Sequence, residues 1–297
     1  MTPAKITGLV PILQTPFDST GLIDTEALRR VVDYNIEAGV DGLGIALASE
    51  VQLFNESERD QLLKTAVDQS NGRVPVVMNT GAIGTDLAVH YSRKAEELGA
   101  DAVMLTPPGS KVASGNPEVT KEYFRDIASS VNIAMVIQDV EFAQVPPAIV
   151  AELASECAEI VACKMETPPT APRISATVDA VQGNIEVLGG GGATFLMEEL
   201  GRGSTGTMPF SSTPVEFAQV FKLYRSGETD AAGELFNERI APLCHLVSQS
   251  PAIAVEFHKQ ILVKRDLIAS SSVRQPAAQI DYHTQRDIDK LLERVIV

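Results

Sequence analysis

The feature that most constrains the fold of this chain is a regular alternation of short apolar segments with helical patterns. The apolar segments recur at intervals of roughly 20–35 residues, which is the βα alternation of a parallel sheet. They lack strict polar–apolar alternation, as expected for strands that are buried on both faces. We predict eight strands: Gly8–Gln14, Gly42–Leu47, Val74–Asn79, Ala102–Leu105, Ile133–Gln138, Ile160–Lys164, Ile185–Leu188 and Ser204–Met208.

Eight strand–helix units within about 210 residues favour an α/β fold of the (β/α)8 TIM-barrel type over an open doubly wound sheet, the alternative architecture. We expect residues 1–213 to form the barrel. Residues 214–297 should form a C-terminal helical extension packed on it as one structural unit, because no further strand-like run follows Pro214. The helices predicted there are Glu216–Ser226, Thr229–Gln249, Ala252–Leu267 and Thr284–Val297.

Helix-capping residues mark several of the intervening helices. Asp24 precedes an apolar pattern that stops at Gly39, and Thr85 precedes a pattern that ends at Gly99. Asn116 and Pro117 open a helix that is predicted to end near Ser129. These signals support the division of the chain into strands and helices.

The composition limits the classes of function. A net charge of −15 (24 Lys and Arg against 39 Asp and Glu) argues against nucleic acid as a partner. No apolar run reaches about 18 residues, so no membrane span is expected, and the short polar N-terminus is not a signal peptide. Three cysteines and four scattered histidines lack metal-ligand spacing, which indicates a cytoplasmic protein without a metal or other cofactor.

Lys164 is the strongest candidate for a catalytic residue. It follows Ile160–Cys163, a short apolar run, where a buried strand should end. A lysine amine in a water-poor setting loses part of its preference for the charged form, and the neutral amine can attack a ketone to form a Schiff base. A structural lysine that pairs with Glu166 is the alternative. The other nine lysines are interpreted as solvated: Lys5, Lys64, Lys94, Lys111, Lys121, Lys222, Lys259, Lys264 and Lys290.

Two further side chains are predicted beside Lys164. Glu166 is two residues further along the strand and should share the same face, whereas Met165 should point outward. Glu166 can therefore serve as a general acid or base, or as a structural partner of the lysine. Gln138 ends the neighbouring strand and offers an amide that can hold a hydroxyl but cannot transfer a proton. Asp139 is expected to face away from the barrel centre or to cap the next loop.

The remaining strand ends supply mostly uncharged groups for binding a substrate. The run Gly189–Gly192 offers backbone N–H donors for a carboxylate or phosphate, or it is simply a tight turn before a helix. Ser49 is a donor to a carboxylate or a helix cap. The residues predicted to bind the substrate are Thr15, Ala48, Ser49, Glu50, Gly190, Gly191 and Thr207.

The order of motifs along the chain resembles the dihydrodipicolinate synthase / N-acetylneuraminate lyase family. The resemblance is carried by Gly8–Phe17, Gly39–Leu43, Glu50 with Glu56–Arg59, and Thr106–Pro108, and it covers nearly the whole chain. It implies a barrel, lysine-imine chemistry on a small 2-keto acid, no metal, and a homotetramer. Lys164 falls where the family carries its Schiff-base lysine.

The departures from the family pattern are informative. Leu47-Ala48-Ser49-Glu50 replaces the Thr-Thr-Gly-Glu motif of the synthases, Gln138 replaces the strand-five tyrosine, and Ala143 replaces an arginine. The tyrosine after the strand-four Thr-Pro turn is also replaced, near Gly109. The hydroxyl relay of the synthases is therefore missing, and dihydrodipicolinate synthesis is not expected.

Val136–Asp139 together with Lys164–Pro168 is similar to the 2-keto-3-deoxy-sugar-acid dehydratase branch of the family. That similarity implies dehydration of L-2-keto-3-deoxyarabonate to 2-oxoglutarate semialdehyde. The alternatives are an aldolase that releases pyruvate and an aldehyde, a deaminase of a cyclic imino acid, and a barrel that binds a 2-keto acid without turnover.

Overall fold

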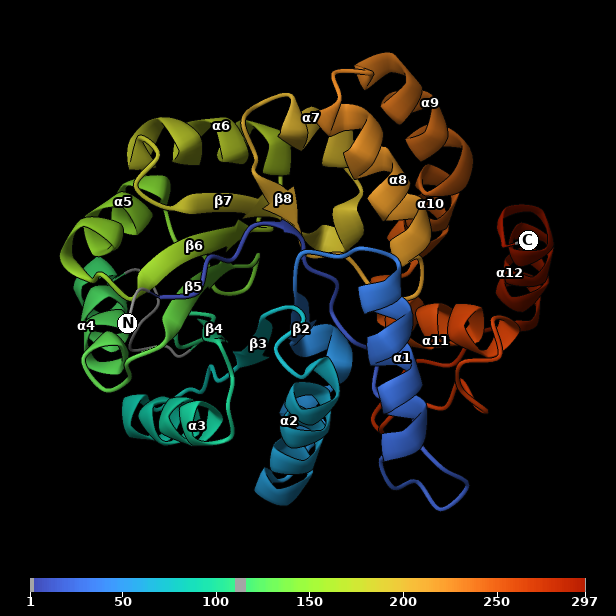
Figure 1. The fold of residues 1–297 in the computed structure, drawn as a ribbon, viewed down its shortest axis with the longest axis horizontal. Coiled ribbons are helices and arrows are strands. Elements are labelled where there is room, and N and C mark those ends of the chain that lie inside the picture. Colours follow the sequence, from blue (N-terminus) through green and yellow to red (C-terminus); the bar gives the residue numbers. More distant parts are fainter. Residues whose placement is uncertain (1–2, 110–115, 297) are drawn as a thin grey trace.

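The computed structural model describes residues 3–109 and 116–296, and its centre is a parallel sheet of eight strands. The strands are β1 (Gly8–Leu9), β2 (Leu43–Ile45), β3 (Val76–Asn79), β4 (Ala102–Leu105), β5 (Ala134–Asp139), β6 (Ile160–Met165), β7 (Glu186–Gly189) and β8 (Gly206–Thr207). Their order in the sheet is β1-β8-β7-β6-β5-β4-β3-β2. The eight predicted strands are therefore confirmed, in the predicted sequence order (Figure 1).

The sheet curls until its two edges meet. Ile12 forms parallel bridges to Gly44 on one side and to Phe210 on the other, so the segment after β1 joins both ends of the sheet. Strand β1 is shorter than the predicted Gly8–Gln14 because Pro11 has no N–H to donate to a ladder. The (β/α)8 barrel expected from the sequence is confirmed.

Helices surround the strands (Figure 1). The barrel helices are α1 (Thr25–Glu37), α2 (Glu56–Ser70), α3 (Thr85–Glu97), α4 (Pro117–Ala128), α5 (Pro147–Glu156), α6 (Thr170–Val181), α7 (Leu196–Leu200) and α8 (Pro214–Arg225). Asp24 and Asn116 cap α1 and α4 as predicted, each accepting a backbone N–H. Gly84 rather than Thr85 is the N-cap of α3.

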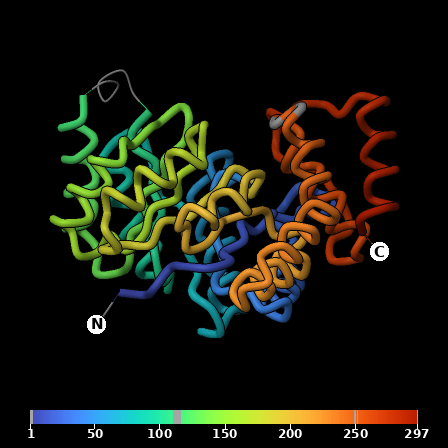
Figure 2. The backbone as a smooth tube through the Cα atoms, turned by 90° about the horizontal axis from the view of Figure 1, so that it is seen from above, coloured from blue at the N-terminus to red at the C-terminus, as the bar shows by residue number. Residues whose placement is uncertain are grey.

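The C-terminal residues form the predicted helical extension. Its helices are α9 (Thr229–Arg239), α10 (Ala241–Gln249), α11 (Ala254–Lys264) and α12 (Tyr282–Val295). The single helix predicted over Thr229–Gln249 is wrong: the chain breaks at Ile240, because Pro242 lies in the first turn of a new helix and cannot continue the previous one. Seen from above, α11 and α12 extend beyond the barrel on one side (Figure 2).

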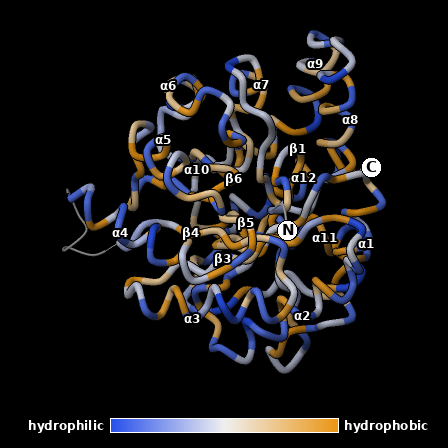
Figure 3. Tube along the Cα trace, turned by 60° about the vertical axis from the view of Figure 1, so that its left-hand side comes forward, coloured by the Kyte–Doolittle hydropathy of each residue, from blue (hydrophilic) through white to orange (hydrophobic). Residues whose placement is uncertain are grey.

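Apolar side chains form two layers, and the strands lie between them. In Figure 3 the central strands, such as β4 and β5, are coloured mostly as hydrophobic segments of the chain. The inner layer fills the barrel with side chains such as Val10, Val77, Val136 and Leu188. The outer layer packs strands against helices and includes Met165 and Cys163. Because neighbouring residues of a strand point to opposite layers, each strand end delivers every second side chain to the barrel mouth.

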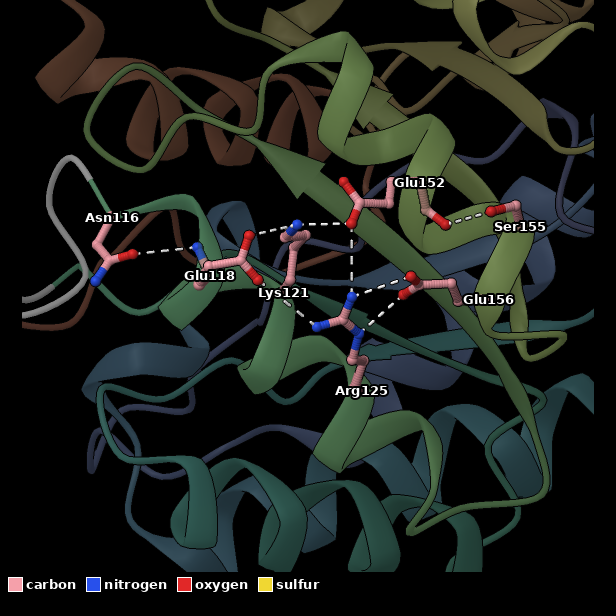
Figure 4. A network of polar contacts seen from close by, with 7 residues as sticks. All are labelled: Asn116, Glu118, Lys121, Arg125, Glu152, Ser155 and Glu156. Carbon is pink, nitrogen blue, oxygen red and sulfur yellow. Dashed lines mark hydrogen bonds and ion pairs between the residues drawn. The ribbon is translucent and has the colours of Figure 1, made fainter.

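An ion-pair network joins α4 to α5 on the outside of the barrel (Figure 4). Lys121 lies 2.6 Å from both Glu118 and Glu152, and Arg125 donates to Glu156 at 2.8 Å. The side chain of Lys121 is only 9% exposed, so the expectation of a solvated lysine is wrong there. The reason is tertiary, because Glu152 comes from the next helix.

Candidate active site

A cavity of about 400 Å³ opens at the carboxyl ends of the strands. This is the end at which barrels of this type place their active sites. Most of its wall is apolar, and its charged groups are Lys164, Glu166 and Glu141. The lining residues are Ile12, Ala46, Leu47, Ala48, Gln138, Val140, Glu141, Phe142, Lys164, Glu166, Gly192, Met208, Pro209 and Phe210.

Lys164 and Glu166 form an ion pair inside this cavity. The Nζ atom of Lys164 lies 2.9 Å from Oε2 of Glu166, and the two side chains are 6% and 15% exposed. Ala162 precedes Lys164 on the inner face of β6, whereas Met165 packs in the outer layer. The predicted shared face is therefore present. A carboxylate at this distance can accept the proton that the ammonium must lose before it becomes a nucleophile.

Gln138 completes a short polar row across β5 and β6. It is the register partner of Lys164, and its Nε2 donates to Oε2 of Glu166 at 2.7 Å. Its Oε1 accepts a longer hydrogen bond of 3.3 Å from Asn79, at the end of β3. The amide is thus oriented by Asn79 and holds Glu166. Asn79 was not among the predicted site residues, although it ends a strand in the sequence.

The glycine run at the end of β7 is shaped around Glu166. The N–H of Gly191 donates to Oε1 of Glu166 at 2.7 Å. A β-carbon on Gly190 would lie 2.5 Å from the same oxygen and would also collide with the Glu166 side chain, so only glycine fits there. The predicted donor for a ligand anion therefore serves the Glu166 carboxylate in this structure. That carboxylate accepts hydrogen bonds from three groups: Lys164, Gln138 and Gly191.

The loop after β2 brings only part of its predicted site residues to the cavity. Ala48 lines the wall, whereas the Ser49 hydroxyl accepts the Ala46 N–H at 3.1 Å and closes a 3-10 turn. The Thr15 hydroxyl donates to the carbonyl of Ser49 at 2.7 Å. Ser49 and Thr15 are thus engaged in supporting the loop that carries Ala48.

Glu50 is directed away from the cavity and toward the C-terminal helices. It pairs with Lys259 of α11 at 2.5 Å and accepts the Arg274 N–H at 2.6 Å. The expectation that Lys259 is solvated is wrong, because its side chain is 0% exposed and stacks on Phe17. Burial lowers the pKa of Lys259 to about 8, with Glu50 acting in the opposite direction.

Thr207 also lies outside the cavity. Met208 and Pro209 line the wall, and Met208 belongs to the inner layer. Because neighbouring residues of a strand point to opposite sides, the side chain of Thr207 points outward. Its hydroxyl is buried and has no hydrogen-bond partner among residues 3–109 and 116–296. Gly190 and Gly191 lie beside Glu166, and Gly192 lines the cavity.

Asp139 faces away from the barrel centre and supports the loops around the cavity, as predicted. It pairs with Arg173 through bonds of 2.6 and 2.7 Å, and it accepts the N–H groups of Val145 and Thr167. These bonds connect the loop after β5 with the turn before α6. Nothing in the local sequence marks Arg173 as the partner of Asp139.

Phe210 is held in the cavity wall by a buried histidine. The rings of Phe210 and His258 are stacked at 3.8 Å, and Nδ1 of His258 is 2.8 Å from the Ser212 hydroxyl. Burial lowers the pKa of His258 to about 3, so the ring is neutral at physiological pH. Its isolated position in the sequence gave no indication of this packing role.

The part of the chain that the structure describes contains no cluster of three or more His, Cys, Asp or Glu side chains that could hold a metal ion. None of the helices described is long and apolar enough to cross a membrane.

A model of the dihydrodipicolinate synthetase family matches residues 5–295. The chain belongs to this family. Its members are lyases, and the fold and the resemblance predicted from the sequence are confirmed.

Relatives in the dihydrodipicolinate synthetase family include enzymes with different names. The chain is 28% identical over 296 residues to L-2-keto-3-deoxyarabonate dehydratase of Azospirillum brasilense, covering 97% of this chain and 94% of that one. It is 34% identical over 233 residues to 4-hydroxy-tetrahydrodipicolinate synthase of Pelobacter propionicus, covering 77% and 79%. The crystal structure of dihydrodipicolinate synthase from Rhodopseudomonas palustris superimposes with a TM-score of 0.90 at 25% identity, covering 99% and 100%.

Proposed function

We propose that this lyase uses Lys164 to form an imine with a 2-keto-3-deoxy sugar acid and then removes water from it. The preferred substrate is L-2-keto-3-deoxyarabonate, and the product is 2-oxoglutarate semialdehyde. The observation that carries the proposal is the pairing of Lys164 with Glu166 at 2.9 Å in the barrel-mouth cavity. The similarity to the Azospirillum dehydratase over 97% of the chain supports the choice of substrate.

The first step needs a neutral amine. Glu166 accepts a proton from Lys164, and the Nζ lone pair attacks the C2 ketone of the substrate. Glu166 then returns its proton to the carbinolamine hydroxyl, which leaves as water. This gives the protonated imine, an electron sink for the carbon beside it, and restores the Glu166 carboxylate. The Glu166 carboxylate, which is next to Nζ, is the group in the described cavity best placed to remove a proton from C3.

Elimination follows from the enamine. The electron pair of the C2=C3 bond expels the C4 hydroxyl, which takes up a proton and leaves as water. Loss of a proton from C5 gives a dienamine with an enol at C4–C5. Loss of the enol O–H proton and reprotonation at C4 and at C3 give the aldehyde and restore the C2 imine. Hydrolysis of the imine then releases the product and regenerates Lys164, so the balance of the reaction is the loss of one water.

Gln138 has a positioning role in this proposal. Its amide donates to Glu166 at 2.7 Å, and the same part of the cavity receives the substrate hydroxyls. An amide cannot transfer a proton between hydroxyl groups, which fits a reaction without an aldehyde acceptor to protonate. The sequence-based assignment of Ala48, Gly190 and Gly191 to substrate binding belongs to this proposal, as do a cytoplasmic location and a homotetramer.

Proton NMR of the purified protein with L-2-keto-3-deoxyarabonate tests the proposal. Signals of 2-oxoglutarate semialdehyde are expected. Pyruvate with glycolaldehyde would instead establish an aldolase. An unchanged spectrum, together with a borohydride-trapped pyruvate adduct on Lys164, would refute the substrate but keep the imine. The Lys164→Ala variant is the control, for which neither turnover nor adduct is expected.

A further inference from the structure

A second buried carboxylate lies behind the active site. Glu199, on α7, is 1% exposed, and neither of its carboxyl oxygens has a hydrogen-bond partner among the described residues. Burial of a carboxylate without donors strongly disfavours its charged form. The position of Glu199 in a short helix after the glycine run gave no reason to expect it in the interior.

Glu199 and Glu166 lie against adjacent glycines of the same strand end. A β-carbon on Gly189 would collide with the Glu199 carboxylate, and one on Gly190 would collide with Glu166. Successive residues of a strand present opposite faces, so the two acids approach the Gly189–Gly190 backbone from opposite sides. The α-carbons of these glycines are about 3.8 Å apart, so the two carboxyl groups lie near enough for the charge of one to affect the other.

Among residues 3–109 and 116–296, no positive charge compensates Glu199. Burial is the main cause that raises the pKa of Glu199 to about 7. The nearby hydroxyl of Thr170 opposes this effect without forming a hydrogen bond of normal geometry, and Glu166 and Glu198 add to it. The basic side chains on the neighbouring elements have other partners. Arg173 of α6 binds Asp139, Arg202 donates to the carbonyl of Glu198, and Lys5 pairs with Glu186 at the far end of β7.

We propose that Glu199 is a positioning residue that acts in its protonated form, filling the space behind Gly189 and leaving Glu166 as the negative charge that pairs with Lys164. When Glu199 loses its proton, a second negative charge is added behind Glu166. That charge favours the ammonium form of Lys164, and fewer molecules carry the neutral amine that attacks the ketone. The proposal rests on the imine chemistry proposed above, but not on the identity of the sugar acid.

The test measures the rate of imine formation with pyruvate, trapped by cyanoborohydride and followed by intact-protein mass, between pH 5.5 and 8.5. Glu199→Gln keeps the shape of the protonated side chain and cannot ionise. Its rate relative to the wild type is expected to be about 1 near pH 6 and to rise to about 3–10-fold at pH 8.5, since one pKa unit corresponds to a factor of ten. Glu234→Gln, the same change at an exposed position of α9, should keep a ratio near 1 throughout.

A ratio for Glu199→Gln that does not change with pH would overturn the role of Glu199, whatever its value. The apolar variant Glu199→Met, which has no buried polar group to satisfy, should show the same rise and provides a second reading if the amide variant folds poorly. Absence of any adduct in the wild type would refute the imine itself, so the two failures are distinguishable.

Discussion

At the scale of single residues, the active-site geometry centres on the carboxylate of Glu166. Lys164, Gln138 and Gly191 all donate to it, from three different strand ends. A side chain held by three donors has little freedom to move, and such preorganisation is what proton transfer within a bound complex requires. The first two predictions follow from this arrangement.

Glu166→Gln is expected still to form the pyruvate adduct on Lys164, because solvent water can take the ammonium proton. It should lower kcat for dehydration by about 10²–10⁴-fold, because the amide cannot accept the C3 proton. Adduct formation is measured by borohydride trapping and turnover by NMR. Glu141→Gln, a change at another carboxylate of the cavity wall, is the matched control and should retain most of the activity. An unchanged rate in Glu166→Gln would leave Glu166 only a structural role.

Gly190→Ala is expected to lower kcat by about 10²-fold by displacing Glu166, since a misplacement of 1 Å at a reacting group costs that much. Gly190 has a φ of −159°, which alanine adopts readily, so the effect comes from the collision with Glu166 and not from backbone strain. Gly233→Ala, in the middle of α9 with no atom near the added methyl, is the control and should stabilise the protein by about 0.5–1 kcal/mol. Normal turnover in Gly190→Ala would contradict the positioning argument.

At the scale of secondary-structure elements, the C-terminal extension holds the loop after β2 in place. Lys259 of α11 reaches Glu50 and the carbonyl of Ser272, and Arg274 donates its N–H to the other Glu50 oxygen. Glu50 has a φ of 63°, a conformation that a non-glycine residue keeps only when its surroundings hold it. The loop that supplies Ala48 to the cavity therefore depends on helices more than 200 residues away in the sequence.

Lys259→Met is expected to reduce the free energy of unfolding by about 3–5 kcal/mol, because it leaves Glu50 as an uncompensated buried charge. The double variant Lys259→Met with Glu50→Gln removes that charge and should recover part of the loss. Urea denaturation followed by circular dichroism measures both. Lys264→Met, at an exposed position of the same helix, is the control and should change stability by less than about 0.5 kcal/mol. Equal stabilities for Lys259→Met and the control would contradict the buried pair.

At the scale of the whole molecule, the buried histidine behind the cavity wall connects stability to pH. His258 is neutral in the folded protein because burial lowers its pKa from 6.5 to about 3. Between these two values the unfolded chain binds a proton that the folded protein does not. The contribution of the neutral His258 to the free energy of unfolding is therefore present in full above about pH 6.5 and declines as the pH falls toward 3.

At pH 5 this proton uptake should cost about 2 kcal/mol of the free energy of unfolding relative to pH 7, from about 1.4 kcal/mol per pH unit below the unfolded pKa. His258→Gln should be less stable than the wild type at pH 7, because it loses the stacking on Phe210. Between pH 7 and pH 5, however, its free energy of unfolding should fall by about 2 kcal/mol less than that of the wild type. Urea unfolding at both pH values measures the difference. His245→Gln, at an exposed position, should follow the wild type, and identical pH dependence in all three proteins would exclude the contribution of His258.

The sequence by itself determined the eight strands, the order of the units, the inward direction of Lys164 and Glu166, and the family. The strands, their order and the inward direction follow from local periodicity, because apolar runs mark strands buried on two faces and residues two apart on a strand share a face. The family follows instead from the resemblance carried by the motifs along the chain. The predicted lengths of strands and helices differ from the structure where proline changes the hydrogen-bonding pattern, as at Pro11 and Pro242.

Only the tertiary structure decided which polar groups line the active-site cavity and which hold its loops and side chains in place. Glu50 turns to Lys259, the Gly191 N–H is bonded to Glu166, and Glu199 lies behind Gly189. Each of these contacts joins segments from different elements, and the direction of each buried polar side chain is set by which donors and charges the closed barrel brings near it. Sequence periodicity indicates which face of a strand a residue occupies, but it contains no information about the partner that faces it across the fold.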